Sequence, residues 1–170
     1  IFPGMVLPLR FGRTASVKAV EAAYPHGGQI VLVDERERHP EGTRHVDPDT
    51  LHRVGSVGQV AQLLRLPDGT YQALIQGVSR ARVNDFRRDG ELLRASVEPI
   101  EDPTVEKTVE VEALMRTVVK QVERYSELSD KVPDGAAEAA RQLETPGRLA
   151  DSVAYSPDMT FAERQELLEI

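Results

Sequence analysis

The chain has 170 residues, of which 40% are hydrophobic, 29% charged and only 5% aromatic. It contains no cysteine, and this absence excludes disulfides, thiolate zinc sites and cysteine nucleophiles. The formal net charge of −7 is uneven, with 13 Lys/Arg and 14 Asp/Glu in residues 1–102 but 8 and 14 in residues 103–170. The acidic second half argues against phosphate binding, and no apolar run reaches the roughly 20 residues that span a bilayer.

The first hundred residues have the short apolar runs of a β-rich structure. Met5 to Phe11 (MVLPLRF) predicts a strand, which Pro8 restricts to a sheet edge or a bulge because proline lacks the N–H donor. Thr14 to Tyr24 predicts a short helix with Tyr24 on its apolar face. Gln29 to Val33 (QIVLV) is typical of a buried strand, and a polar surface loop is expected to follow it.

A β-hairpin is the most clearly specified element. It is predicted over Leu63 to Val83, around the turn Leu66-Pro67-Asp68-Gly69, in which proline fixes φ and glycine accepts the left-handed position. The glycine-rich Gly55 to Gly58 indicates a turn before the first strand rather than a phosphate loop, because it lacks a lysine and no helix follows. Leu92 to Val97 predicts the last strand.

Helical periodicity replaces the strand pattern after residue 102. A long helix is predicted over Thr104 to Leu128. Shorter helices are expected over Asp134 to Leu143, from Thr145-Pro146, and after the capping box of Thr160 to Glu163. The apolar stripe of the long helix consists of Val111, Leu114, Met115, Val118, Val119, Val122 and Tyr125.

These elements predict an α+β fold. We expect a β-rich subdomain with one short helix over residues 1–102, and an α-helical bundle over residues 103–170. The chain begins at Ile1 rather than methionine, and its last predicted helix is still apolar at Ile170. We therefore expect it to be a fragment of a longer protein.

The sequence contains no recognisable catalytic constellation. His39, His45 and His52 lie near Asp47 and Asp49, which suggests a metal site, but their spacing matches no ligand motif and surface loop residues are the favoured interpretation. No G-x-S-x-G motif occurs, and no serine stands beside a plausible base. We expect no catalytic residue, no metal site and no cofactor in this chain.

The apolar stretch from Ile1 to Leu9 has two interpretations. It can be core packing, with proline protecting an edge strand. It can also be an exposed surface that contacts unfolded polypeptide, for which a flexible methionine side chain is suited. In the second interpretation the candidate contact residues are Phe2, Met5, Leu7 and Leu9.

An ordered series of motifs resembles the amino-terminal domain of the ATP-dependent Lon proteases. No single motif decides the resemblance, but the motifs follow one another over nearly the whole chain. They are Phe2 to Leu9 (FPGMVLPL) with Gly12-Arg13, Ser16 to Ala23 (SVKAVEAA), Val54 to Val57 (VGSV), Leu63 to Gly69 (LLRLPDG), Gln76-Gly77, Arg80 to Arg82 (RAR), Pro146 to Ala150 (PGRLA) and Gln165 to Leu168 (QELL).

The resemblance implies a PUA-like first subdomain and a helical second subdomain whose last helix becomes a connector. It implies a non-catalytic module that recognises unfolded or degron-bearing proteins and helps to organise a cytoplasmic homohexamer in protein quality control. The AAA+ ATPase, with its ATP and Mg, and the Ser-Lys protease dyad of the family would lie beyond residue 170. None of their residues can be placed on this chain.

Two other classes of function remain open. A stand-alone PUA-like domain that binds RNA or a small ligand would use Arg80, Arg82, Arg87 and Arg88, although acids lie beside these residues and a solvated face is favoured. A self-contained enzyme is the least favoured class because the machinery is absent. We therefore expect protein partners and no membrane or nucleic-acid partner.

Overall fold

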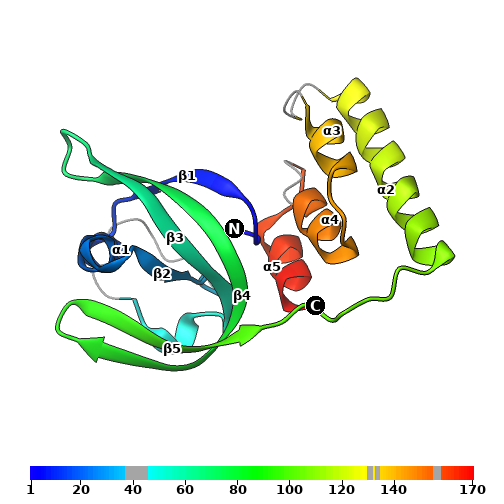
Figure 1. Cartoon of the computed structure of the whole chain (residues 1–170). Helices are drawn as coiled ribbons and strands as arrows, with labels where there is room; N and C mark the ends of the chain where they lie inside the picture. The colour runs from blue at the N-terminus through cyan, green and yellow to red at the C-terminus, as the bar shows by residue number, and fades with distance from the viewer. Residues whose placement is uncertain (37–45, 130–131, 133–134, 155–157) are drawn as a thin grey trace. The chain divides into compact units, whose positions relative to one another are not determined.

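The computed structural model describes residues 1–36, 46–129, 132, 135–154 and 158–170 (Figure 1). The chain divides into two compact units, residues 1–101 with Glu169, and residues 102–168 with Ile170. The first unit contains an antiparallel sheet and the second contains several helices, which confirms the α+β fold class. The PUA-like character of the first unit and the connector role of the last helix stay predictions.

The sheet of the first unit is built around one long strand. β4 has β1 and β3 on its two sides along its first part, and it pairs with β5 along its second part (Figure 1). The described strands have the order β1-β4-β3-β2, and β5 joins at β4. Their bounds are β1 Val6–Phe11, β2 Gln29–Leu32, β3 Val54–Arg65, β4 Tyr71–Asp89 and β5 Leu92–Ile100.

The hairpin between β3 and β4 forms at the predicted turn. The Leu66 N–H donates to the Thr70 carbonyl at 2.8 Å, and Gly69 takes a left-handed φ of +83°. The turn predicted at Gly55 to Gly58 is wrong, because these residues lie inside β3. A Cβ on Gly58 would lie only 2.7 Å from Ile75 Cγ2. The glycine therefore serves close packing within the sheet rather than a reversal of the chain.

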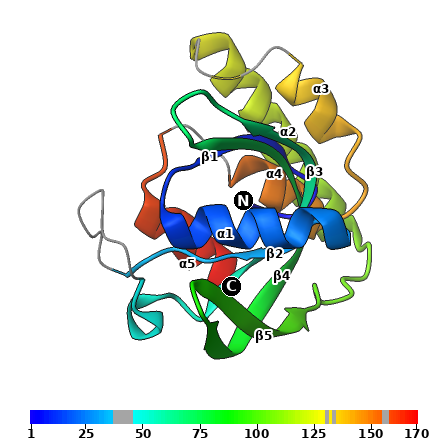
Figure 2. The same cartoon turned by 90° about the vertical axis from the view of Figure 1, so that its left-hand side faces the viewer.

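The core of the first unit lies between the sheet and α1 (Thr14–Ala23), which runs across the strands in Figure 2. Tyr24 does not pack with this helix as predicted. It belongs to the 3-10 turn η1 (Tyr24–His26) and is 44% exposed, since the α-helix ends one residue earlier. The buried cluster consists of Val20, Val60, Ala73 and Ile75, with Ile1, Leu9, Phe11, Ile30, Leu32 and Leu63 packed around it.

The described residues of the second unit form four helices. α2 begins five residues later than predicted because Thr108 caps it, its hydroxyl accepting from the Val111 N–H at 3.3 Å. No residue of α2 is fully buried, and Leu114 is 66% exposed, so the apolar stripe is only partly covered. The bounds are α2 Val109–Leu128, α3 Ala136–Arg141, α4 Pro146–Val153 and α5 Phe161–Glu169.

The caps predicted for the last two helices are present. The Thr145 hydroxyl accepts from the Arg148 N–H, and Pro146 opens α4. Thr160 and Glu163 form the predicted capping box, in which the Thr160 N–H donates to the Glu163 carboxylate at 2.7 Å. These caps pair N–H groups that have no partner within the helix.

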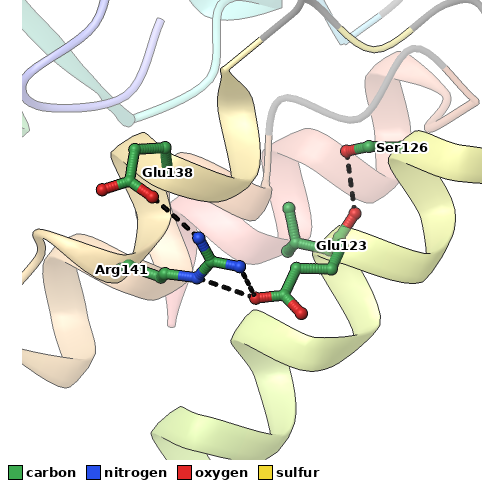
Figure 3. A network of polar contacts seen from close by, with 5 residues as sticks. Glu123, Ser126, Glu138 and Arg141 are labelled. Carbon is green, nitrogen blue, oxygen red and sulfur yellow. Dashed lines mark hydrogen bonds and ion pairs between the residues drawn. The ribbon is translucent and has the colours of Figure 1, made fainter.

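An exposed arginine connects α3 to α2 (Figure 3). Arg141 donates from Nε and Nη2 to Glu123 of α2 at 2.8 and 2.5 Å, and from Nη1 to Glu138 at 2.7 Å. These two carboxylates, Glu123 first, raise the pKa of the Arg141 guanidinium. The site is exposed to solvent, so the network fixes geometry more than it adds stability.

Candidate functional site: an uncharged face of the sheet

The four predicted contact residues do not form one exposed surface. Phe2 is only 3% exposed, so its predicted direct contact with a partner conflicts with the fold, in which its ring is part of the interior. Leu9 packs against the core cluster, and Met5 and Leu7 are half-buried. All four stay predictions as contact residues, and a contact by Phe2 would require its buried ring to become exposed.

Backbone hydrogen bonds hold this N-terminal segment against β4. The Gly4 N–H donates to the Gly77 carbonyl at 2.9 Å, and the Gly77 N–H donates to the Met5 carbonyl at 2.8 Å. The Ser56 hydroxyl, itself buried, donates to the Ile1 carbonyl at 2.5 Å. The chain before β1, which includes the buried Phe2, is therefore held against β3 and β4 by hydrogen bonds.

Strand alternation decides which side chains of β1 reach solvent. Leu7 and Leu9 belong to its less exposed face, whereas Val6, Pro8 and Arg10 are exposed on the other face. Val6 is 51% exposed. The predicted set contains Leu7 and Leu9 but not Val6, although the period of two in VLPLRF separates the two faces.

The exposed face of β1 continues across two further strands. Residues paired across an antiparallel sheet lie on the same face, so the register extends the exposed side of β1 through β4 to β3. We call this surface the outer face. It consists of Val6, Pro8 and Arg10 of β1, Gln76, Leu74 and Gln72 of β4, and Gln59, Gln62 and Leu64 of β3.

The outer face is apolar and amide-rich, with little charge. Leu64 is 56% exposed and Leu74 lies half-buried at the centre. Only one of the nine residues, Arg10, is charged, although 29% of the whole chain is charged. Depletion of charge together with exposed apolar side chains is typical of the central part of an interaction surface.

Arg10 is neutralised by the hairpin turn. Its guanidinium forms an ion pair with the Asp68 carboxylate, and its Nε donates to the Thr70 hydroxyl at 3.2 Å. That hydroxyl and the Thr70 N–H both donate to Asp68, at 2.6 and 3.0 Å. The hydrogen bond from the Thr70 hydroxyl, then that from its N–H and the Arg10 charge, lower the pKa of Asp68. The outer face and the adjacent Asp68 together therefore carry no net charge near neutral pH.

We expect Thr70→Val to raise the pKa of Asp68 towards its ordinary value, because the variant removes the strongest hydrogen bond to the carboxylate. Since this pKa is lowered on folding, the turn is stabilised above the ordinary pKa of aspartate and loses that contribution as the pH falls through the lowered value. A carboxyl-carbon NMR titration measures the shift. An unchanged Asp68 pKa in Thr70→Val would contradict the described network.

β1 is an edge strand among the described residues, as its proline predicted. The bond from the Gly77 N–H to the Met5 carbonyl means that Leu7 and Leu9 direct their backbone groups towards β4, since bonded pairs alternate along an antiparallel ladder. The backbone of Pro8 therefore faces the open edge. Because Pro8 faces the open edge, its lack of an N–H removes no hydrogen bond within the sheet. It does remove a donor that a strand added at this edge would need.

We expect Pro8→Thr to increase self-association, because it places a hydrogen-bond donor in the middle of the open edge of β1. Sedimentation velocity at rising protein concentration measures this effect. Val6→Thr is the matched control, since it adds the same side chain to the same strand without adding an N–H. Equal self-association of the two variants would show that the proline does not protect the edge.

Two of the four arginines of β4 make polar contacts with neighbouring groups. Arg87 lies 3.0 Å from Asp85, and Arg88 donates to the Val46 carbonyl at 2.8 Å. The ion pair of Arg87 with Asp85 offsets positive charge that phosphate binding needs. The interpretation of these residues as a solvated face is therefore favoured over a nucleic-acid site.

The described residues contain no group of three or more metal-ligating side chains placed to hold a metal ion. His39 and His45 lie outside the described residues. Asp47 has a structural role, because its carboxylate accepts from the Asp49 N–H at 3.0 Å and caps the short turn η2 (Pro48–Thr50). None of the described helices is both long enough and apolar enough to span a membrane.

The fold is of the α+β class, with an antiparallel sheet unit that has a charge-poor exposed face and a unit of helices. The chain is similar over its full length to the N-terminal domain of a Lon protease from the Mycobacterium avium complex, with a TM-score of 0.70, 24% identity and coverage of 84% of that chain. A Lon N-terminal domain protein from Xanthomonas campestris matches 92% of this chain and 93% of its own, with a TM-score of 0.52 and 19% identity.

Sequence comparison identifies the family. The family model described as the ATP-dependent protease La (LON) substrate-binding domain matches residues 1–170, and the chain belongs to this family. Lon protease of Escherichia coli K12 is 36% identical over 170 residues, and Lon protease of Azospirillum brasilense is 38% identical over 169 residues. The chain spans about a fifth of the length of these relatives, 21% and 20% respectively.

Proposed function

We propose that the chain is the substrate-recognition and assembly domain of a Lon-type ATP-dependent serine protease that degrades misfolded, damaged and short-lived regulatory proteins. The observation that carries the proposal is the match of a substrate-binding family model to all 170 residues. In this proposal the domain binds unfolded or degron-bearing polypeptide and does not catalyse a reaction. ATP hydrolysis with Mg and peptide-bond cleavage belong to other parts of the parent protein, which acts as a cytoplasmic homohexamer.

Apolar surface around β1 would provide the contact with substrates. Val6 is exposed and Met5 and Leu7 are half-buried, so apolar atoms are accessible along the strand without unfolding it. A small apolar contact gives weak binding, because ordering a flexible chain offsets most of the gain. Weak binding suits a domain that must release its substrate to the ATPase and protease parts of the proposed parent protein.

The test is a chemical-shift titration of the isotope-labelled 170-residue chain with a permanently unfolded protein. We expect fast-exchange shifts in β1 of the wild-type chain and weaker association for the double variant Met5→Ser, Leu7→Ser. Circular dichroism establishes that the variant is folded. If the wild-type chain shows no shifts at any concentration of the unfolded protein, the proposed function is wrong.

A further inference from the structure

We propose that the outer face binds extended, uncharged segments of unfolded polypeptide and discriminates against charged segments of either sign. This inference rests on the proposed function and specifies the chemistry of the substrate that this surface takes. It is carried by the register of three strands, by the exposure of the apolar residues and by the pairing of Arg10 with Asp68.

Charge complementarity selects the occupant. The single cation of the outer face is already paired with Asp68, so the face offers no unpaired counter-charge to a lysine or a glutamate of a bound chain. We call a bound polypeptide a client. A charged side chain of a client would lose part of its hydration on the outer face without gaining an ion pair in return. An uncharged segment of a client has no charged group whose hydration would be lost. It therefore suits the outer face, which is neutral together with Asp68 although the whole chain has a net charge of −7.

Amide groups on the outer face fit the peptide backbone of a client. Gln62, Gln72 and Gln76 are exposed, and each side-chain amide has both a donor and an acceptor, as a peptide group does. Gln59 differs, because its amide donates to the Gly27 carbonyl and is held by this unit. Hydrogen bonds to a client backbone do not depend on the client's side chains, so the face tolerates many sequences.

The apolar residues would provide the remaining contact. Val6 and Leu64 lie at opposite corners of the face, and Leu74 lies at its centre. A face of five residues along a strand is about 13 Å long at roughly 3.3 Å per residue, which accommodates about four to six residues of an extended chain. The open edge of β1 is a poorer site for strand addition, because Pro8 lacks a donor there.

The experiment compares capped ten-residue peptides by titration against the labelled 170-residue chain. One peptide alternates valine with glutamine, and two others replace the glutamines with glutamate or with lysine. We expect the uncharged peptide to bind at least fivefold more tightly than both charged peptides and to shift the resonances of Gln72, Leu74 and Gln76. Tighter binding of either charged peptide would overturn the proposal.

Substitutions of exposed residues locate the contact. Leu64→Lys and Leu64→Glu should each weaken binding of the uncharged peptide at least fivefold, because either charge removes the neutrality of the face. Leu114→Lys is the matched control, since that leucine is 66% exposed on α2, outside the outer face, and the variant should bind like the wild-type chain.

The outcomes separate this inference from the proposed function. If the wild-type chain binds a permanently unfolded protein but both Leu64 variants bind it equally well, the outer face is not the site and the proposed function stands. If Leu64→Glu binds more tightly while Leu64→Lys binds less tightly, the face prefers basic segments and the neutral preference is wrong. Absence of any binding by the wild-type chain contradicts both proposals.

Discussion

Replacing Gly77 with alanine is expected to destabilise the sheet unit by about 2–4 kcal/mol. A Cβ at this position would lie 2.2 Å from the Phe2 carbonyl oxygen and 2.7 Å from Ile1 Cγ2. The Phe2 carbonyl oxygen is a backbone atom and cannot rotate away as the end of a flexible side chain can. The N-terminal segment must therefore move as a whole. The movement would expose the Phe2 ring and break the hydrogen bonds that connect Gly77 with Gly4 and Met5.

Urea unfolding followed by circular dichroism measures this loss, and the control is Gly12→Ala. The nearest atom to a Cβ on Gly12 is Thr70 Cγ2 at 3.7 Å, which is an ordinary van der Waals contact. We expect this control to keep the stability of the wild-type chain within about 1 kcal/mol. Equal stability of Gly77→Ala and Gly12→Ala would show that the N-terminal segment is not packed against β4 as described.

Ile75→Ala is expected to cost about 2–5 kcal/mol, the range for truncating a large aliphatic residue in a packed core. Ile75 is 0% exposed, pairs with Leu7 of β1 and Val60 of β3, and is in the cluster that includes Val20 of α1. Its truncation leaves a cavity where the helix meets the sheet. The rigid neighbouring strands can fill that cavity only in part.

The same unfolding measurement with Leu64→Ala provides the comparison. Leu64 is on the opposite side of the sheet and is 56% exposed, so its truncation should cost less than about 1 kcal/mol. A cost for Ile75→Ala as small as that for Leu64→Ala would mean that the core does not lie between α1 and the sheet.

The features that could be predicted from sequence are those set by local chemistry. Pro67 and Gly69 specify their own backbone angles, which explains why the hairpin turn forms where the sequence placed it. Thr145 and Thr160 carry side-chain acceptors that pair with N–H groups three residues later, so two helix starts were predicted correctly. In such cases the residues that decide the structure lie within one turn of one another.

The features that were missed depend on neighbours distant in the sequence. Gly55 lies in β3, where a Cβ would be 2.3 Å from the Leu32 carbonyl oxygen, so the glycine allows the Leu32 backbone to approach, a contact that no local pattern reveals. Phe2 is buried because Gly77, 75 residues later, allows the chain to approach. The outer face requires the register of three strands, and the sequence alone does not provide the register between β1 and β4.

The position of Pro8 on the open edge of β1 has a mechanical consequence for any chain held beside it. A strand added to a sheet resists a pull along its axis, because many backbone bonds carry the load together. A chain held only by separate side-chain contacts peels away one contact after another, under a force set by the weakest of them. If the proposed function holds, a motor that draws such a chain from one end would meet little resistance from this domain.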